Sequence, residues 1–238
     1  MMHGVLQALA PEVRVVNLTH GVPAQDIGIA AFFLARSRGY FPQGTVFVAV
    51  VDPGVGTSRR ILAAFDGGQV LLAPDNGLLG PALGPEAEVR AVDVERFALP
   101  GASATFHGRD IFCPTAARLA RGEVRFEDLG PRIEDFLRAA LPAPARTGKV
   151  VRGEVLFADR FGNLITNVEP ADLEGDPHRW SAQAAGQALD WVRTYGDARA
   201  GAASILVNSY GLLEIAVAAG SAQRTLGVGA GAAVEFER

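Results

Sequence analysis

Acidic and basic side chains flank a glycine-rich turn in the stretch VVDPGVGTSRR (50–60). The preceding run, TVFVAVV (45–51), is typical of a buried strand, so Asp52 and Arg59 follow the end of that strand. The stretch lacks the lysine of a phosphate-binding P-loop, and its glycines stop short of a dinucleotide-binding fingerprint. Ligands of α/β proteins bind at the carboxyl ends of strands. Asp52 and Arg59 are therefore candidate site residues, although the motif by itself favours a structural ion pair.

A histidine stands in the second polar motif, TFHGRDIFCPTAA (105–117). His107 can act as a general base near neutral pH, because the pKa of an imidazole is close to 6.5. Taken alone, it is more typical of a hydrogen-bonded core histidine. Asp110 stands before an expected helix, and its carboxylate is predicted to cap the helix by accepting free backbone N–H groups.

Three further turns carry polar side chains that could bind a ligand. Each is also compatible with ordinary turn chemistry, in which Asp, Asn and Ser side chains bond to nearby backbone. The strand–turn–strand LFADRFGNLITNV could offer several hydrogen bonds to a polar ligand. The residues concerned are Asp75 and Asn76 in LLAPDNGLLG, Asp159, Asn163, Thr166 and Asn167 in LFADRFGNLITNV, and Asn208, Ser209 and Tyr210 in VNSYGLLEIAV.

The sequence predicts neither a metal centre nor the nucleophile elbow of an α/β-hydrolase. The four histidines are scattered, with no pair at helical spacing, and Cys113 is the single cysteine, so neither a metal set nor an internal disulfide is predicted. The G-x-S-x-G motif of α/β-hydrolases is absent. The histidines are His3, His20, His107 and His178.

The elements that must position these residues alternate between helix and strand in the first 140 residues. Continuous apolar strands alternating with helices predict an α/β fold with a mainly parallel central sheet. Asp26 is expected to cap one helix and Gly39 to end it. The expected elements are a helix over 4–10, strands over 13–19 and 45–51, a helix over 26–41, a hairpin over 61–77 that turns at Asp66-Gly67-Gly68, and a helix over 111–122 closed by Gly122.

The pattern changes after LPAPARTG (141–148), a proline-rich stretch that is predicted to be a linker. Short strands separated by Gly- and Asn-rich turns follow it, over 150–168, 204–220 and 232–238. Such strands predict a small β-barrel. We therefore expect two domains, an N-terminal α/β domain over 1–143 and a C-terminal β-barrel domain over 149–238.

Composition restricts the partners and the location. Hydrophobic residues make up 49% and charged residues 20% of the 238 residues, which is typical of a globular protein. A net charge of −4 gives no electrostatic reason to expect a nucleic acid or an anionic membrane as partner. No apolar run reaches the length of a membrane span, and the first residues do not resemble a signal peptide. With a single cysteine, this favours a cytoplasmic location.

Together the motifs are far more specific than any one of them. VVDPGVGTSRR, APDNGLL, FHGRDIFCPTAA, FADRFGNLITNV and NSYGLLEIAV, in this order, resemble the S-adenosyl-methionine (SAM) hydroxide adenosyltransferases, which are related to the adenosyl-fluoride and chloride synthases. The resemblance covers nearly the whole chain. It implies an N-terminal α/β domain, a C-terminal β-barrel and a homotrimer whose substrate binds between the N-domain of one subunit and the C-domain of the next. It also implies hydrolysis of SAM to adenosine and L-methionine without a cofactor.

The resemblance assigns site residues by motif position. The Asp–Arg–His set of the family's hydrolytic members falls on Asp52, Arg59 and His107. The halide-using relatives depart from this set, so its presence favours water as the nucleophile. The expected substrate-binding residues are Asp75 and Asn76 in a motif at the adenosine site, Asp159 and Asn163 for the methionine part and the adenine, and Ser209, another methionine contact, with Tyr210 beside it.

The implied reaction suits these residue types. The attacked atom is the ribose C5′ carbon, and the leaving thioether needs no acid because it departs from a sulfonium. The requirement is a good nucleophile held in line with the C–S bond. A guanidinium favours hydroxide electrostatically, and a neutral imidazole can accept the proton. Asp52 could orient the imidazole or balance the charge of Arg59.

One departure from the family leaves alternatives open. Family members usually begin with a strand carrying T-D-F-G, whose Asp holds the ribose hydroxyls, and this sequence has no such segment. We therefore expect weaker substrate binding than in a longer relative. One alternative is a halide-dependent adenosyltransferase, which the Asp–Arg–His set and Gln25, at a position where halide enzymes carry an aromatic residue, disfavour. The other is a non-catalytic adenosine- or SAM-binding protein, which the departure itself supports.

Overall fold

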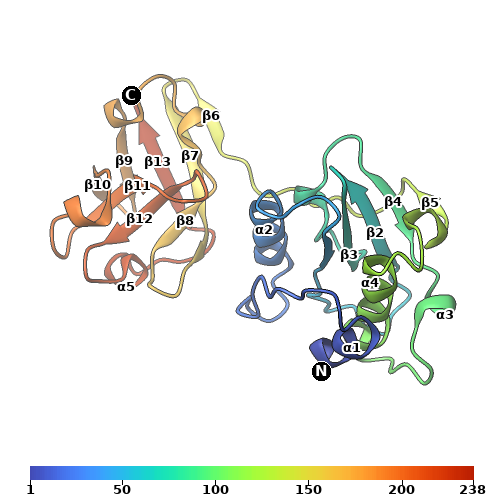
Figure 1. The fold of residues 1–238 in the computed structure, drawn as a ribbon. Helices are drawn as coiled ribbons and strands as arrows, with labels where there is room; N and C mark the ends of the chain where they lie inside the picture. Colours follow the sequence, from blue (N-terminus) through green and yellow to red (C-terminus); the bar gives the residue numbers. More distant parts are fainter. The chain divides into compact units, whose positions relative to one another are not determined.

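The computed structural model describes residues 1–238 and divides into two compact units, Met1–Ala140 and Leu141–Arg238 (Figure 1). The first unit contains a five-stranded sheet with the strand order β1-β3-β2-β4-β5. Its strands are β1 (Val46–Val48), β2 (Ile61–Asp66), β3 (Gln69–Pro74), β4 (Glu88–Ala91) and β5 (Arg132–Ile133). No helix of the protein is both long and apolar enough to cross a membrane.

The sheet is mixed, so the expectation of a mainly parallel sheet is wrong. Only β1 and β3 pair in parallel, whereas β2 pairs antiparallel with both β3 and β4, and β4 pairs antiparallel with β5. The predicted hairpin joins β2 to β3 through Gly67 and Gly68, whose φ values are 58° and 78°. The continuous apolar runs arise because helices cover both faces of the sheet, and this burial does not depend on strand direction.

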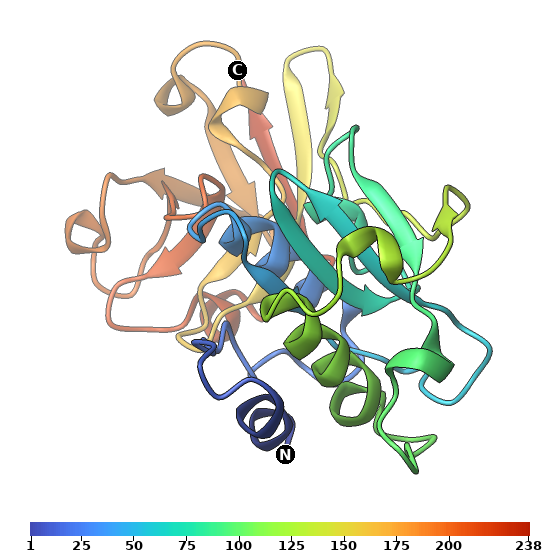
Figure 2. The same cartoon turned by 45° about the vertical axis from the view of Figure 1, so that its right-hand side comes forward.

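Two helical layers enclose this sheet (Figures 1 and 2). Leu62 and Ala64 of β2 pack on the side of α2 (Ile27–Arg38), whereas Ile61 and Ala63 pack on the side of α4 (Cys113–Ala120). This alternation follows from the two-residue period of a strand. The smaller helical elements are α1 (Met2–Leu9), which lies beside α4, α3 (Val94–Phe97), η1 (Gly80–Ala82) and η3 (Phe126–Asp128).

The local helix signals are confirmed. Asp26 caps α2 by accepting a hydrogen bond from the backbone N–H of Ile29 at 2.9 Å, and Gly39 follows its last residue. The first helix ends before Pro11, as expected. The helix expected over 111–122 is α4, which is preceded by a π-helical turn, η2 (Gly108–Phe112), and is followed by Gly122 in the left-handed region.

The segment 13–19 does not form the predicted buried strand. Val15, Val16 and Leu18 expose 38%, 50% and 41% of their surface. The physical reason is the lack of a ladder partner, because β1 pairs with β3 alone and no strand of the structure pairs with 13–19. An apolar run becomes a strand only when its backbone N–H and C=O groups find partners.

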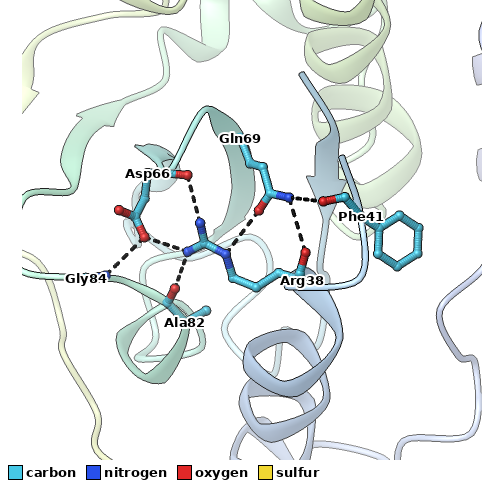
Figure 3. A network of polar contacts seen from close by, with 6 residues as sticks. All are labelled: Arg38, Phe41, Asp66, Gln69, Ala82 and Gly84. Carbon is cyan, nitrogen blue, oxygen red and sulfur yellow. Dashed lines mark hydrogen bonds and ion pairs between the residues drawn. The ribbon is translucent and has the colours of Figure 1, made fainter. Parts of the chain in front are cut away.

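A polar network joins α2 to the β2–β3 hairpin (Figure 3). Arg38 donates to the Asp66 carboxylate at 2.6 Å, to the Asp66 carbonyl at 2.7 Å and to the Gln69 side chain at 3.1 Å. Gln69 in turn donates to the carbonyl of Phe41 at 2.8 Å, and the backbone N–H of Gly84 donates to Asp66 at 3.1 Å. The network fixes the end of the helix against the sheet.

The second unit is a β-barrel, as predicted. Its strand order β13-β9-β10-β11-β12-β8-β7 is closed into a ring by a further pairing of β13 with β7, and β6 pairs with β7 outside the ring. The strands are β6 (Ala145–Thr147), β7 (Val150–Ala158), β8 (Leu164–Thr166), β9 (Ser181–Ala184), β10 (Gln187–Trp191), β11 (Ala203–Val207), β12 (Leu213–Val217) and β13 (Ala233–Glu237). Part of the stretch expected to be a linker is therefore a strand, β6.

Apolar side chains fill the barrel interior. Trp180 and Phe236 are almost fully buried there, with Leu213 and Ile215 of β12. Turns and one helix connect the strands, namely η4 (Pro170–Asp172), η5 (Pro177–Arg179), η6 (Tyr195–Asp197) and α5 (Ala222–Leu226). The closed ring leaves no free edge except at β6, so nearly every strand has both its neighbours.

Candidate active site

Asp52 and Arg59 meet across the turn that follows β1. The Nε atom of Arg59 donates to Oδ1 of Asp52 at 3.0 Å, and Nη2 of the same guanidinium donates to Oδ2. Only 10% of the Arg59 side chain and 5% of the Asp52 side chain are exposed. The pair is therefore bidentate and shielded from water, a geometry that fixes the guanidinium in one orientation.

His107 joins this pair from 48 positions further along the chain. Nη2 of Arg59 lies 2.8 Å from Nδ1 of His107. Because a guanidinium has no acceptor, Nδ1 must accept this hydrogen bond, and a neutral ring carries its proton on Nε2. Burial lowers the pKa of His107 below its ordinary value, and the charge of Arg59 lowers it further. The imidazole is therefore neutral near pH 7.

Backbone contacts bring the turn to the histidine. Gly56 has a φ of 81°, and a Cβ at this position would lie 2.8 Å from the carbonyl oxygen of Ala104. Only glycine allows both the left-handed conformation and this close approach. The Arg59 guanidinium also lies 6.0 Å from the ring centre of Phe112, in the π-helical turn that begins beside His107. Asp52, Arg59 and His107 thus form one continuous chain of contacts.

Asp110 does not cap a helix, so this expectation is wrong. Its carboxylate accepts hydrogen bonds from Nε of Arg109 at 2.6 Å and from the backbone N–H of Ser103 at 2.8 Å. The hydrogen bond from Arg109 is the main cause that lowers the pKa of Asp110 to about 2. Asp110 lies inside the π-helical turn rather than in front of it, so its side chain faces the preceding loop.

Asp75 and Asn76 form hydrogen bonds with residues next to the Asp52–Arg59 turn. Asp75 accepts from Nε of Arg60 at 2.9 Å and from the backbone N–H of Leu137 at 2.9 Å. Asn76 donates from Nδ2 to the carbonyl of Val51 at 2.9 Å. The structure therefore places both residues next to the proposed centre, and their contacts with a substrate stay a prediction.

The other predicted residues lie in the second unit. Asp159 accepts from the backbone N–H groups of Phe161 at 2.8 Å and Asn163 at 2.9 Å, and the Asn163 amide donates to it at 3.2 Å. Asn163 is buried, Tyr210 is half-buried and Ser209 is exposed. The strand–turn–strand reading of this region is confirmed, while the substrate contacts of all four predicted residues stay predictions.

Sequence reasoning missed a buried carboxylate in the second unit. Glu214 of β12 is 3% exposed and accepts a hydrogen bond from the hydroxyl of Tyr195 at 2.7 Å. Burial raises the pKa of Glu214, and the charge of Asp159 raises it further. The available signal was one acid within the apolar run LLEIAV (212–217), since an ionised group is seldom buried without a partner.

Two domain families match the chain, one in its N-terminal part and one in its C-terminal part. The SAM hydroxide adenosyltransferase N-terminal domain matches residues 1–130, and the SAM hydroxide adenosyltransferase C-terminal domain matches residues 153–235. The chain belongs to the SAM hydroxide adenosyltransferase family. The two matches fall within the two compact units, and the N-terminal match includes Asp52, Arg59 and His107.

Individual relatives agree with this membership. A Thermus thermophilus protein named (R)-S-adenosyl-L-methionine hydrolase is 41% identical, over 99% of this chain and 92% of its own length. A fluorinase from an Actinoplanes species is 27% identical, over 72% of this chain and 67% of its own. The crystal structure of an uncharacterized conserved Thermotoga maritima protein superposes with a TM-score of 0.89 at 31% identity, covering 100% of this chain and 94% of that chain.

Proposed function

We propose that this family member hydrolyses S-adenosyl-L-methionine to adenosine and L-methionine. The observation that carries the proposal is the contact chain from Asp52 through Arg59 to His107, which gathers the three residues expected to activate water. The near-full-length relative that is named as a hydrolase of this substrate supports it. No group of three or more His, Cys, Asp or Glu residues that could hold a metal ion occurs in the structure. On the ground of the family resemblance, we propose that the reaction uses no cofactor.

In the proposed reaction, water attacks C5′ of the ribose while the C5′–S bond breaks. The electron pair of that bond stays on sulfur, so the sulfonium becomes the neutral thioether of methionine. The water oxygen becomes the 5′-hydroxyl of adenosine, and one proton is released. A neutral leaving group needs no acid, so the barrier depends on the nucleophile and on its alignment with the C–S bond.

The contacts support separate roles for the three residues. Asp52 touches Arg59 rather than the imidazole, which favours the charge-balancing role for this carboxylate over the orienting one. Arg59 lies between Asp52 and His107, where its positive charge lowers the pKa of an adjacent water. His107 accepts the water proton at Nδ1, and the Arg59 N–H that the ring releases then donates to the hydroxide.

The test is incubation of the purified chain with S-adenosyl-L-methionine, followed by chromatographic detection of products. Adenosine and L-methionine are expected in equal amounts, and Asp52→Asn, Arg59→Ala and His107→Ala should each lower the rate on the order of 10²-fold. A parallel incubation in high chloride addresses the halide alternative, for which chlorinated adenosine would form. Calorimetric binding without product in a long incubation would instead favour the non-catalytic alternative.

We also propose a homotrimeric, cytoplasmic protein with an N-terminal domain over 1–143 and a C-terminal domain over 149–238. The family resemblance supports the trimer, and the single buried cysteine, Cys113, is compatible with a reducing compartment. Light scattering of the purified protein should give three times the chain mass of 25.0 kDa. A mass of one chain would contradict this assembly.

A further inference from the structure

We propose that Asp75 and Asn76 are positioning residues that hold both ends of the Asp52–Arg59 loop and so set the geometry of the water-activating contacts. This inference deepens the proposed function and rests on it. The loop begins after Val51 and ends before Arg60. These two flanking residues are the ones that the Asp75-Asn76 pair binds.

Asn76 holds the entry of the loop. Its Nδ2 donates to the carbonyl of Val51 at 2.9 Å, while its Oδ1 accepts the backbone N–H of Leu78 at 3.2 Å. The donor and the acceptor of the amide are thus both used, and their partners fix which way the amide faces. Because Val51 directly precedes Asp52, this hydrogen bond restrains the peptide from which the carboxylate projects.

Asp75 forms two hydrogen bonds with Arg60, the residue that follows the loop. Its backbone N–H donates to the carbonyl of Arg60 at 3.0 Å, and its carboxylate accepts from Nε of Arg60 at 2.9 Å. Only 8% of the Asp75 side chain is exposed, whereas 34% of the Arg60 side chain is, so the carboxylate is the shielded partner of the pair. Because Arg60 directly follows Arg59, the two bonds restrain the backbone that carries the central guanidinium.

We call the contacts of Asp75 and Asn76 with the two ends of the loop the clamp. The segment 135–139 makes further contacts with it. The backbone N–H of Leu137 donates to the second carboxylate oxygen of Asp75 at 2.9 Å, and Arg60 donates to Asp135 at 2.9 Å. A Cβ at Gly80 would overlap the backbone carbonyl of Ala139, so this segment lies directly on the Gly77–Gly80 turn. Asp75 and Arg60 are therefore bonded to a segment outside the loop as well as to each other.

Inside the loop, the backbone N–H of Val55 donates to the Asp52 carbonyl at 3.3 Å, the Thr57 hydroxyl donates to the Gly54 carbonyl at 2.7 Å, and Gly56 rests against Ala104. These contacts hold the shape of the loop, whereas Asn76 and Asp75 hold its two ends. The end positions, together with the Gly56 contact, therefore decide where Arg59 meets His107. A displacement of about 1 Å can cost roughly 10²-fold in rate, because the nucleophile must stay in line with the bond that breaks. Release of the clamp should therefore lower kcat while leaving KM nearly unchanged.

The experiment compares two Asn76 variants with a control in the same unit. Asn76→Ala removes the donor to Val51 without adding charge, and Asn76→Asp keeps the acceptor for Leu78 but places an oxygen against the Val51 carbonyl. Asp66→Asn is the matched control, because it disturbs the Arg38 network at the hairpin and touches no part of the loop. We measure kcat and KM with S-adenosyl-L-methionine, and the pKa of His107 by NMR titration of the ring.

Both Asn76 variants should lower kcat at least about tenfold, with KM within about threefold of the wild type. The pKa of His107 should rise toward its ordinary value in Asn76→Ala, because the contact with Arg59 loosens. The control should change neither the pKa nor kcat. A raised KM with unchanged kcat would overturn the inference, because it would identify Asn76 as a substrate contact, and so would an unmoved pKa.

The NMR titration also separates this inference from the proposed function. If the wild type forms no adenosine, the proposed hydrolysis fails, whereas a raised pKa of His107 in Asn76→Ala would still support the clamp. If the wild type is active and Asn76→Ala matches it in kcat and in the pKa of His107, the clamp fails and the hydrolysis stands.

Discussion

We expect the substitution Gly56→Ala, which adds one methyl group, to disturb the Asp52–Arg59–His107 centre selectively. Its φ of 81° costs an L-residue about 1–2 kcal/mol of folding free energy. A Cβ would also lie 2.8 Å from the Ala104 carbonyl oxygen, so the loop must move by roughly 0.6 Å to restore ordinary contact. We expect Gly56→Ala to lower kcat about 10- to 100-fold, because the loop carries Asp52 and Arg59.

Gly44→Ala provides the matched control. Gly44 has a φ of 80°, and a Cβ there would meet no atom within 4 Å, so the two substitutions share the backbone strain but not the clash. Thermal unfolding should show similar losses of stability, with a somewhat larger loss for Gly56→Ala. Adenosine formation should fall in Gly56→Ala alone. Equal activity in the two variants would refute the reasoning that the approach of Gly56 to Ala104 sets the site geometry.

Three further predictions concern other groups. Because burial lowers the pKa of His107 below 6.5, kcat/KM should rise with pH and reach its plateau near pH 7, which a pH–rate profile checks. Folding stability should fall as the pH drops below 6.5, because the unfolded chain then binds a proton that the folded chain does not, and pH-dependent melts check this. Asp66→Asn should lower the free energy of unfolding by about 1–3 kcal/mol in urea melts, because Arg38 loses its charged partner (Figure 3). Tyr195→Phe should cost about 1–2 kcal/mol by the same measurement, because buried Glu214 loses the hydroxyl that donates to it at 2.7 Å.

Features set by neighbouring residues were predictable from the sequence. Asp26 begins α2 because capping depends on groups within a few positions, and Gly67-Gly68 form the hairpin because their φ values suit that turn. The Asp52–Arg59 pair was open to prediction for the same reason, since the two residues are seven positions apart.

Features set by distant segments were not predictable from local patterns. The stretch 13–19 has the composition of a strand but no ladder partner, and the antiparallel pairing of β4 with β2 and β5 depends on contacts that burial does not encode. The contact of His107 with Arg59 spans 48 positions, so only the order of several motifs, and not the spacing of one, indicated it. The engagement of Asp75 and Asn76 with the loop depends likewise on tertiary contacts.

The most direct test of the proposed hydrolysis is a single turnover of S-adenosyl-L-methionine in ¹⁸O-labelled water, with mass spectrometry of the products. We expect adenosine that carries one ¹⁸O atom at its 5′-hydroxyl and L-methionine that carries none, because water attacks C5′ and the C5′–S bond breaks. Unlabelled adenosine, or a product other than adenosine, would contradict it.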